Sequence, residues 1–411
     1  MEDVSFTGIF VVAAVAFSAP LLLGLAPAIR IPAVVLELVG GIIVGPSVLG
    51  WVEPDTALEV LSLLGLAFLL LIAGLEIDFD RLRGRLLGLT SAAFALSLAL
   101  ALGVGLMLDI GGLVRSPLLV AIMLAATSLG IVVPVLKDSG RSNSPVGLLV
   151  ITGASIADLA SIVLLSLFFS GESSDLGAQL ILVGAFGLLV VVLALTLIGI
   201  EHWMRLGETL VRLQDTTAQI RVRGVFVLLA LFVAFAEGFG LEAILGAFAA
   251  GALINLVDRD RAMTHPQFRQ KLEGASFGIF VPFFFVTSGV KFDLDALLAG
   301  GSSLAKVPIF LAALLLVRGV PALLYRRLIG LRESVAAGLL QATSLGSFVV
   351  AGQIGMELGL LSAATGAALI AAGLASVLLF PSAALVLLSG ASRSETSRAV
   401  PAPPPAGSHP P

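Results

Sequence analysis

The residue in this sequence with the clearest chemical potential is Asp158, which lies in the middle of a long apolar stretch, ITGASIADLASIVLLSLFF. A charged side chain at the centre of a membrane-spanning helix costs roughly 2.5–3.5 kcal/mol on the insertion scale, so its presence there indicates a role. A buried carboxylate can hold a proton or a hard alkali cation, but not both, because each neutralises the same charge. The plainer alternative is a structural acid that only hydrogen-bonds or pairs with a cationic side chain.

Hydroxyl groups accompany this acid along the chain. Ser155 and Ser161 lie three residues before and after Asp158, which places their hydroxyls on the same face of a helix. Hydroxyl and carboxylate oxygens are the ligands that hard cations prefer. The spacing therefore predicts a polar site around Asp158, with Ser155 as one of its ion-binding groups.

A repeated motif, ATSLG, supplies further candidate ligands. It occurs once with Thr127 and Ser128 and again with Thr343 and Ser344. Small and hydroxylated residues let a helix unwind inside a membrane and offer oxygen atoms, although ordinary small-residue helix packing would use the same residues. We expect Thr343 and Ser344 to support the site. The predicted ion- and proton-binding residues are Asp158, Thr127, Ser128 and Ser155, with Asp158 and Thr127 as the metal ligands for Na+ or K+.

Other charged residues in apolar surroundings are weaker candidates. Arg318, in FLAALLLVRGVPALLYRR, could pair with a buried acid, cap unwound carbonyls or extend toward an interface, and we expect it to support the site. Glu37 and Glu242 lie near expected helix starts, where an acid is favoured by the helix dipole. Glu76 belongs to a charged segment that also contains Arg81 and is expected to be a topology signal without chemistry.

The elements that position these residues must be membrane helices. Hydrophobic residues make up 58% of the 411 residues and charged residues only 12%, which no water-soluble domain of this size tolerates. Cysteine is absent, and His202, His265 and His409 lie outside the apolar stretches, so thiol chemistry and buried histidine ligation are excluded. The composition predicts an all-α integral membrane protein that is no enzyme, needs no cofactor, contacts membrane lipid and has no nucleic-acid partner.

Thirteen apolar segments separate the charged clusters and are expected to span the membrane. With the N-terminus outside, 19 of the 23 lysines and arginines fall in cytoplasmic loops, which matches the positive-inside rule. Arg115, Lys291 and Lys306 remain outside, and Arg318 lies within a span. The pattern predicts a multi-pass protein of the inner (plasma) membrane with a cytoplasmic C-terminus. The expected spans cover residues 6–26, 33–50, 57–75, 86–109, 117–136, 146–169, 177–200, 222–240, 242–257, 275–290, 303–325, 333–355 and 360–389.

An internal repeat organises these spans. The ATSLG blocks are offset by 216 residues, while AGLEIDFDRL at 73–82 matches SGVKFDLDAL at 288–297 and DLASIVLL at 158–165 matches GLASVLLF at 373–380, both offset by 215. Matching spans are seven apart, so the repeats have opposite orientations, as in secondary transporters with crossed discontinuous helices. The predicted units are 1–170 (first six-helix repeat), 171–221 (linker helix and cytoplasmic loop), 222–390 (second repeat) and 391–411 (disordered cytoplasmic tail).

Several longer segments resemble the monovalent cation:proton antiporter superfamily, in the branch of bacterial sodium/proton exchangers and potassium efflux proteins. They are LELVGGIIVGPSVLG at 36–50, LLLIAGLEIDFDRLR at 69–83, GLEAILGAFAAGALI at 240–254, FFFVTSGVKFDLDAL at 283–297 and RG at 318–319. The resemblance, over roughly residues 5–390, implies that Asp158 is the ion- and proton-carrying acid, that Thr127 and Ser128 lie at the crossing of broken helices, and that Arg318 matches the family's arginine. It also implies homodimers with core and dimerisation domains.

The function expected from these features is exchange of Na+ or K+ for protons, with competition at Asp158, alternating access and a contribution to pH homeostasis. A single acid at this position, without a buried lysine in the tenth span, predicts electroneutral exchange by the same resemblance. The alternative is a sodium-coupled symporter of an organic solute, which needs a roomy polar pocket beside the ion site. An intramembrane enzyme is disfavoured because no Cys or His lies in the apolar stretches to activate a nucleophile or hold a catalytic metal. A titratable acid at a helix break suits a carrier that alternates, not a channel.

Overall fold

The chain folds into a bundle of helices that matches the predicted all-α class. The computed structural model describes residues 5–25, 31–76, 84–169, 176–203, 219–257, 266–298 and 301–398, and all regular structure in these ranges is helical. The α-helices are α1 (Phe6–Leu25), α2 (Ala33–Val44), α3 (Thr56–Leu75), α4 (Gly84–Ile110), α5 (Pro117–Ala125), α6 (Leu129–Asp138), α7 (Pro145–Phe169), α8 (Leu176–Trp203), α10 (Ile220–Gly238), α11 (Ala243–Val257), α12 (Pro266–Ala275), α13 (Val281–Val290), α14 (Leu294–Leu298), α15 (Gly301–Ala322), α16 (Arg326–Ile329), α17 (Leu331–Gln341), α18 (Gly346–Glu357) and α19 (Ala363–Arg398), with a π-helical turn η1 (Ser276–Phe280) and a 3-10 turn η2 (Leu323–Tyr325).

Length and composition suit these helices to a lipid environment. Within the described ranges, nine helical stretches are long and apolar enough to cross a membrane, and three shorter apolar helices cover Ala33–Val44, Leu180–Leu193 and Ala243–Leu256. A span needs about 20 apolar residues, so the shorter helices cross only with help from their flanks. The chain is a multi-pass membrane protein, while the count of thirteen spans stays a prediction.

Both ATSLG blocks lie where a helix is interrupted, as the sequence predicts. Helix α5 ends at Ala125 and α6 begins at Leu129, with extended backbone at Ala126 and Ser128 between them. Helix α17 ends at Gln341, and α18 begins at Gly346. Interrupted helices leave N–H and C=O groups without their usual partners, so each break needs other groups to satisfy them.

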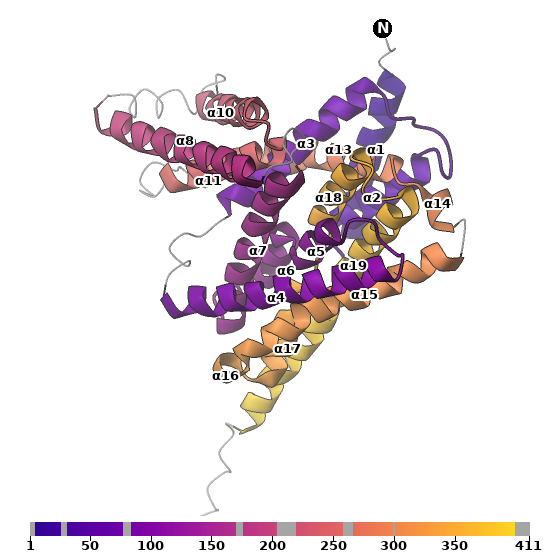
Figure 1. Ribbon diagram of the computed structural model, residues 1–411, viewed down its shortest axis with the longest axis vertical. Coiled ribbons are helices and arrows are strands. Elements are labelled where there is room, and N and C mark those ends of the chain that lie inside the picture. Colours follow the sequence, from indigo (N-terminus) through magenta and orange to yellow (C-terminus); the bar gives the residue numbers. More distant parts are fainter. Residues whose placement is uncertain are drawn as a thin grey trace, which may run out of the picture.

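The two interruptions are hydrogen-bonded to each other, and Figure 1 shows α5 and α6 near the middle of the molecule, with α18 above them and α17 below. The backbone N–H of Ser128 donates to the carbonyl oxygen of Thr343 at 3.0 Å, and the hydroxyl of Thr127 donates to the carbonyl oxygen of Gln341 at 2.8 Å. Segments more than 200 residues apart in the chain therefore supply each other's missing hydrogen bonds.

Helix contacts sort most of the bundle into two sets. Helices α1, α2, α3, α10, α11 and α13 pack among themselves, and α4, α5, α7, α15, α17, α18 and α19 do the same. Each set contains helices from both halves of the sequence. In the first set, a side chain on Gly41 would overlap the Val286 carbonyl and one on Gly251 would overlap the Leu71 carbonyl, so α2 with α13 and α3 with α11 pack backbone against backbone.

Three boundaries differ from the predicted spans by more than five residues. Helix α2 ends at Val44 because Gly45 and Pro46 follow it, so the expected segment 33–50 is shorter. The tenth span starts at Pro266, before the predicted residue 275, because the polar helix α12 runs into η1 and α13. Helix α19 continues through Arg398 into the segment predicted as a disordered tail, and residues 399–411 lie outside the described residues.

Candidate functional site

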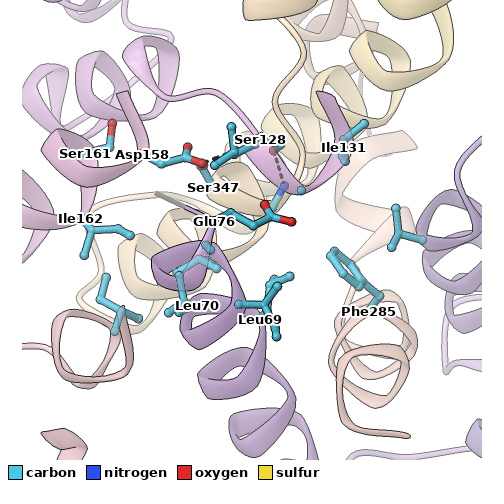
Figure 2. Close-up of a pocket in the computed structure, with 18 of the residues that line it drawn as sticks. Leu69, Leu70, Glu76, Ser128, Ile131, Asp158, Ser161, Ile162, Phe285 and Ser347 are labelled. Carbon is cyan, nitrogen blue, oxygen red and sulfur yellow. Dashed lines mark hydrogen bonds between the residues drawn. The ribbon is translucent and has the colours of Figure 1, made fainter. Parts of the chain in front are cut away.

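A cavity of about 110 Å³ lies where the two sets of helices meet. Its lining is mostly apolar, with a small number of polar side chains from α3, α6, α7 and α18 and the residues that follow or precede them. Figure 2 shows Asp158 and Glu76 extending toward the same space from different helices. The polar lining residues are Glu76, Ser128, Asp158, Ser161 and Ser347.

Asp158, in the middle of α7, is the acid at this cavity. Its Oδ2 accepts a hydrogen bond from the backbone N–H of Leu129 at 3.1 Å, and Leu129 is the first residue of α6. The N-terminus of a helix carries partial positive charge and free N–H groups, so it stabilises an anion placed there. The second oxygen, Oδ1, is buried and has no hydrogen-bond partner among the described residues. One oxygen of the carboxylate thus holds the helix break, and the other is available to a ligand.

The two hydroxyls of the first ATSLG block are already engaged. Ser128 lines the cavity, and its Oγ accepts hydrogen bonds from the N–H groups of Leu345 and Gly346 at 2.9 and 3.1 Å. Thr127 is fully buried, and its hydroxyl donates to Gln341 and accepts from Arg318. Thr127 does not line the cavity, and its ligand role stays a prediction, which would use the lone pair that these two bonds leave on the hydroxyl oxygen.

Arg318 on α15 donates hydrogen bonds to both interrupted helices. Its side chain is 2% exposed, and its three hydrogen bonds go to the hydroxyl of Thr127 at 2.7 Å, the carbonyl oxygen of Gln341 at 3.3 Å and the hydroxyl of Ser97 at 3.4 Å. All three acceptors are uncharged oxygens. Of the roles considered for Arg318, capping of unwound backbone is the one that these contacts match.

Four hydroxyl groups remain to be placed: those of Ser155 and Ser161 on α7, and those of Thr343 and Ser344 in the second ATSLG block. Ser155 donates to the carbonyl oxygen of Ile151 at 3.0 Å, and it does not line the cavity. Thr343 donates in the same manner to Leu339 at 3.2 Å. Ser161 and Ser344 are buried with hydroxyls that have no partner in the part of the chain that the structure describes. Of these four, Ser161 alone lines the cavity.

Comparison with known families identifies the family to which the chain belongs. Residues 13–389 match the family described as sodium/hydrogen exchanger, transmembrane. The chain belongs to this exchanger family. It is therefore a member of the monovalent cation:proton antiporter superfamily that its motifs resemble, and its family is one of transporters.

Individual relatives of the exchanger agree with this placement. It is 33% identical to the putative Na(+)/H(+) antiporter YjbQ of Bacillus subtilis over 92% of its own length, but it spans only 62% of that relative. It is 27% identical to the Na(+)/H(+)-K(+) antiporter GerN of Bacillus cereus, over 65% of this chain and 67% of GerN. The structure of the sodium proton antiporter MjNhaP1 from Methanocaldococcus jannaschii is similar with a TM-score of 0.67 at 20% identity, over 93% of this chain and 98% of that one, which shows a common fold.

One residue lines the cavity although the sequence did not indicate it. Glu76 follows the last residue of α3, lines the cavity with Asp158 and has a buried Oε2 without a hydrogen-bond partner in the described ranges. Burial raises the pKa of this carboxyl to about 7, against the opposing charges of Arg269 and Lys137. The neighbouring charges in the sequence made Glu76 look like part of a solvated loop. A repeat comparison signals the difference, because Glu76 aligns with Lys291 at the offset of 215.

Proposed function

We propose that this exchanger is a secondary active antiporter that exchanges a monovalent cation, Na+ or K+, for a proton at Asp158. The observation behind the proposal is the divided hydrogen bonding of the Asp158 carboxylate. One oxygen accepts from Leu129 at the start of α6, and the other is buried at the wall of the cavity without a partner. A buried anionic oxygen without a partner is costly, so it favours an occupant that the protein exchanges.

Competition between the two ions follows from the chemistry of one carboxylate. A proton on Oδ1 removes the charge that attracts a cation, and a cation beside Oδ1 disfavours the protonated form. If the empty, charged carboxylate cannot move across the barrier, each movement requires one ion or the other. Asp158 then moves a cation in one direction and a proton in the other, which is antiport by alternating access.

The same arrangement favours an electroneutral exchange. Asp158 and Glu76 come from different sets of helices, α7 from one and α3 from the other, so only Asp158 belongs to the unit that contains the crossed breaks. One titrating group in the moving unit exchanges one proton for one monovalent cation. The names of the relatives support both Na+ and K+ as cargo, since GerN is a Na(+)/H(+)-K(+) antiporter.

The membrane arrangement belongs to the same proposal. We expect the exchanger in the inner (plasma) membrane, with the N-terminus outside and the C-terminus in the cytoplasm, because of the distribution of lysine and arginine. We also expect two inverted six-helix repeats, a core and a dimerisation domain and a homodimer. The ATSLG breaks support the repeats, and the two sets of contacting helices support the division into domains.

The size of the cavity argues against the organic-solute symporter. Sites for organic ligands typically measure about 300–1,000 Å³ and contain several convergent polar groups. The cavity beside Asp158 is about 110 Å³, and its lining is mostly apolar. It suits a partly dehydrated cation better than a solute.

The proposal is tested with the purified protein in liposomes that contain a pH-sensitive dye. Addition of Na+, K+ or Li+ should drive proton movement in wild type, and Asp158→Asn should abolish it because the amide takes up no proton in this pH range and lacks the negative charge that attracts the cation. Asp109→Asn, which neutralises an exposed acid near the end of α4, is the matched control and should behave as wild type. Exchange at the same initial rate with and without an imposed membrane potential would support electroneutrality. Full activity of Asp158→Asn would refute the proposal.

A further inference from the structure

Two serines flank Asp158 at equal distances along α7, and the structure treats them differently. Both are buried, with Ser155 4% and Ser161 3% exposed. Ser155 bonds within its own helix by donating to the carbonyl oxygen of Ile151, four residues earlier. This is the usual resting arrangement for a serine inside a membrane helix, and Ser276 and Ser334 of this chain adopt it too. The hydroxyl of Ser155 thus has its partner without any ligand.

Ser161 does not have that arrangement. Its hydroxyl is buried, and across the described ranges no hydrogen-bond partner reaches it. A buried hydroxyl without a partner is unfavourable and is uncommon in folded proteins, so it calls for an explanation. The residue lines the cavity one helical turn beyond Asp158 (Figure 2). Its position therefore points to a ligand that the cavity receives.

The second repeat shows what a serine at this place does when no ion is involved. Ser376 aligns with Ser161 at the offset of 215. Its hydroxyl accepts from the N–H of Ser344 at 3.1 Å and donates to the carbonyl oxygen of Gly373 at 2.7 Å. In the first repeat the N–H of Ser128, which aligns with Ser344, donates to the carbonyl oxygen of Thr343. The N–H of the next residue, Leu129, donates to the carboxylate of Asp158. The hydroxyl of Ser161 therefore makes no hydrogen bond to the helix break, unlike that of Ser376.

Two more oxygen atoms at the cavity share this property. Asp158 Oδ1 and Glu76 Oε2 are also buried without partners among the residues described. Two carboxylates and one hydroxyl form an all-oxygen set, which suits a hard alkali cation. A proton needs only one of these oxygens, whereas a cation that has shed part of its water shell needs several.

We propose that Ser161 is a side-chain ligand of the transported cation and sets the affinity of the exchanger for it. This inference rests on the proposed antiport at Asp158 and names a group that serves the cation but not the proton. Removal of the hydroxyl should raise the KM for the cation by about tenfold, since a hydrogen-bonding group lost from a charged partner costs about that factor. The maximal rate and its pH dependence at saturating cation should change by less than about twofold, because the proton binds Asp158.

The experiment compares Ser161→Thr with Ser161→Val, which have the same shape and differ in the hydroxyl. Any cost of the larger side chain is common to both, so the ratio of their cation KM values isolates the oxygen atom. Ser161→Ala adds a third variant without extra volume. Ser334→Ala removes a buried serine hydroxyl from α17, far from the cavity lining, and is the matched control. We expect Ser161→Thr near wild type, Ser161→Val and Ser161→Ala at about tenfold higher KM, and Ser334→Ala unchanged.

A second measurement does not depend on transport. The melting temperature of the detergent-solubilised protein, titrated with NaCl at constant ionic strength, gives the cation concentration for half-maximal stabilisation. That concentration should rise in Ser161→Val and not in Ser161→Thr. Equal KM and equal half-maximal concentrations in these two variants would overturn the role of Ser161, as would a rise for Ser155→Ala without one for Ser161→Ala. Such results leave the antiport intact if Asp158→Asn is inactive, whereas failure of the antiport appears as wild type without cation-driven proton movement.

Discussion

The two ATSLG segments are identical in sequence, but different groups accept the hydrogen bonds of their backbone N–H groups. At the second break, the N–H of Ser344 binds Ser376, and those of Leu345 and Gly346 bind Ser128. At the first break, the N–H of Leu129 binds the carboxylate of Asp158 instead. Helix α18 starts against neutral hydroxyl groups, and helix α6 starts against an acid that keeps a second carboxylate oxygen at the cavity, unpartnered in the described part of the chain. If the proposed antiport holds, an ion site in one half of the chain requires a change in only one partner of a helix N-terminus.

Neighbouring positions reinforce this asymmetry. The residue aligned with Asp158 is Gly373, where an added Cβ would lie 2.8 Å from the carbonyl oxygen of Ser344. The residue aligned with Glu76 is Lys291, which donates to Glu59 at 3.0 Å in an exposed ion pair. The first repeat therefore presents two carboxylates to the cavity, and the second presents neither. The second break supplies the carbonyl oxygens of Thr343 and Gln341, which accept hydrogen bonds from the first break.

The largest expected effect comes from an attempt to move the acid to the second repeat. Gly373→Asp forces a side chain against the Ser344 carbonyl and buries a new carboxylate, so it should cost about 3 kcal/mol or more of folding free energy. We expect a strong drop in folded protein by size-exclusion chromatography. The combination Asp158→Asn with Gly373→Asp should show no exchange.

Gly373→Ala is the control for that substitution, because it adds only the Cβ. We expect a loss of about 1 kcal/mol, seen as a lower melting temperature in detergent. A stable Gly373→Asp protein with ion exchange restored in the Asp158→Asn background would show that the two breaks are interchangeable, contrary to the comparison.

A smaller difference separates the two serines of the ATSLG segments. Ser128→Ala removes the acceptor of two N–H groups at the start of α18 and leaves both buried, so it should cost about 1–3 kcal/mol. Ser344→Ala removes a hydroxyl without a partner in the described chain and should change stability by less than about 0.5 kcal/mol. Thermal unfolding in the same detergent measures both. Equal losses would show that the hydroxyls, and hence the breaks, are equivalent.

These pairs also show how far the sequence predicts the molecule. Asp158 could be located because an acid in an apolar run has few structural explanations, and the helix breaks could be located because ATSLG recurs in register. The hydrogen-bond partners could not be assigned. The hydroxyl of Thr127 is engaged by Arg318, 191 residues away, and that contact exists only once the breaks have crossed. The periodicity of a helix places Ser155 and Ser161 equally, and only packing decides which faces the cavity.

The sequence also predicted a wrong end for one helix and a wrong environment for one charged residue. The predicted span 33–50 ran past Gly45 and Pro46 and was wrong at this end, because the helix stops at Val44. Glu76 was missed because acids and arginines follow it in the sequence, which is typical of a solvated loop. Its place at the cavity depends on how α3 packs against the helices around it.

Ser376 offers a prediction of moderate size that contrasts with Ser161. Ser376→Ala leaves the N–H of Ser344 without its side-chain acceptor, so stability should fall by about 1 kcal/mol. The cation KM should stay within about twofold of wild type, because the residue does not line the cavity. Ser161→Ala should show the reverse pattern, with a raised KM and little loss of stability. Thermal unfolding and liposome exchange on both proteins would reveal a shared pattern if the repeats were functionally alike.

The smallest expected effect concerns Glu76 and its aligned residue Lys291. Because burial raises the pKa of Glu76 to about 7, its carboxyl gains a proton and loses its charge as the pH falls through 7. Glu76→Gln has no charge at any pH, so its cation KM should exceed that of wild type by about two- to fivefold at pH 8 and converge with it at pH 6. Lys291→Gln removes an exposed charge outside the cavity and should leave the pH dependence of KM unchanged. Measurement of KM from pH 6 to pH 8 tests whether the charge of Glu76 contributes to cation binding. A ratio between Glu76→Gln and wild type that is constant with pH would mean that Glu76 acts by shape alone, and the first repeat would then contribute a single titrating acid.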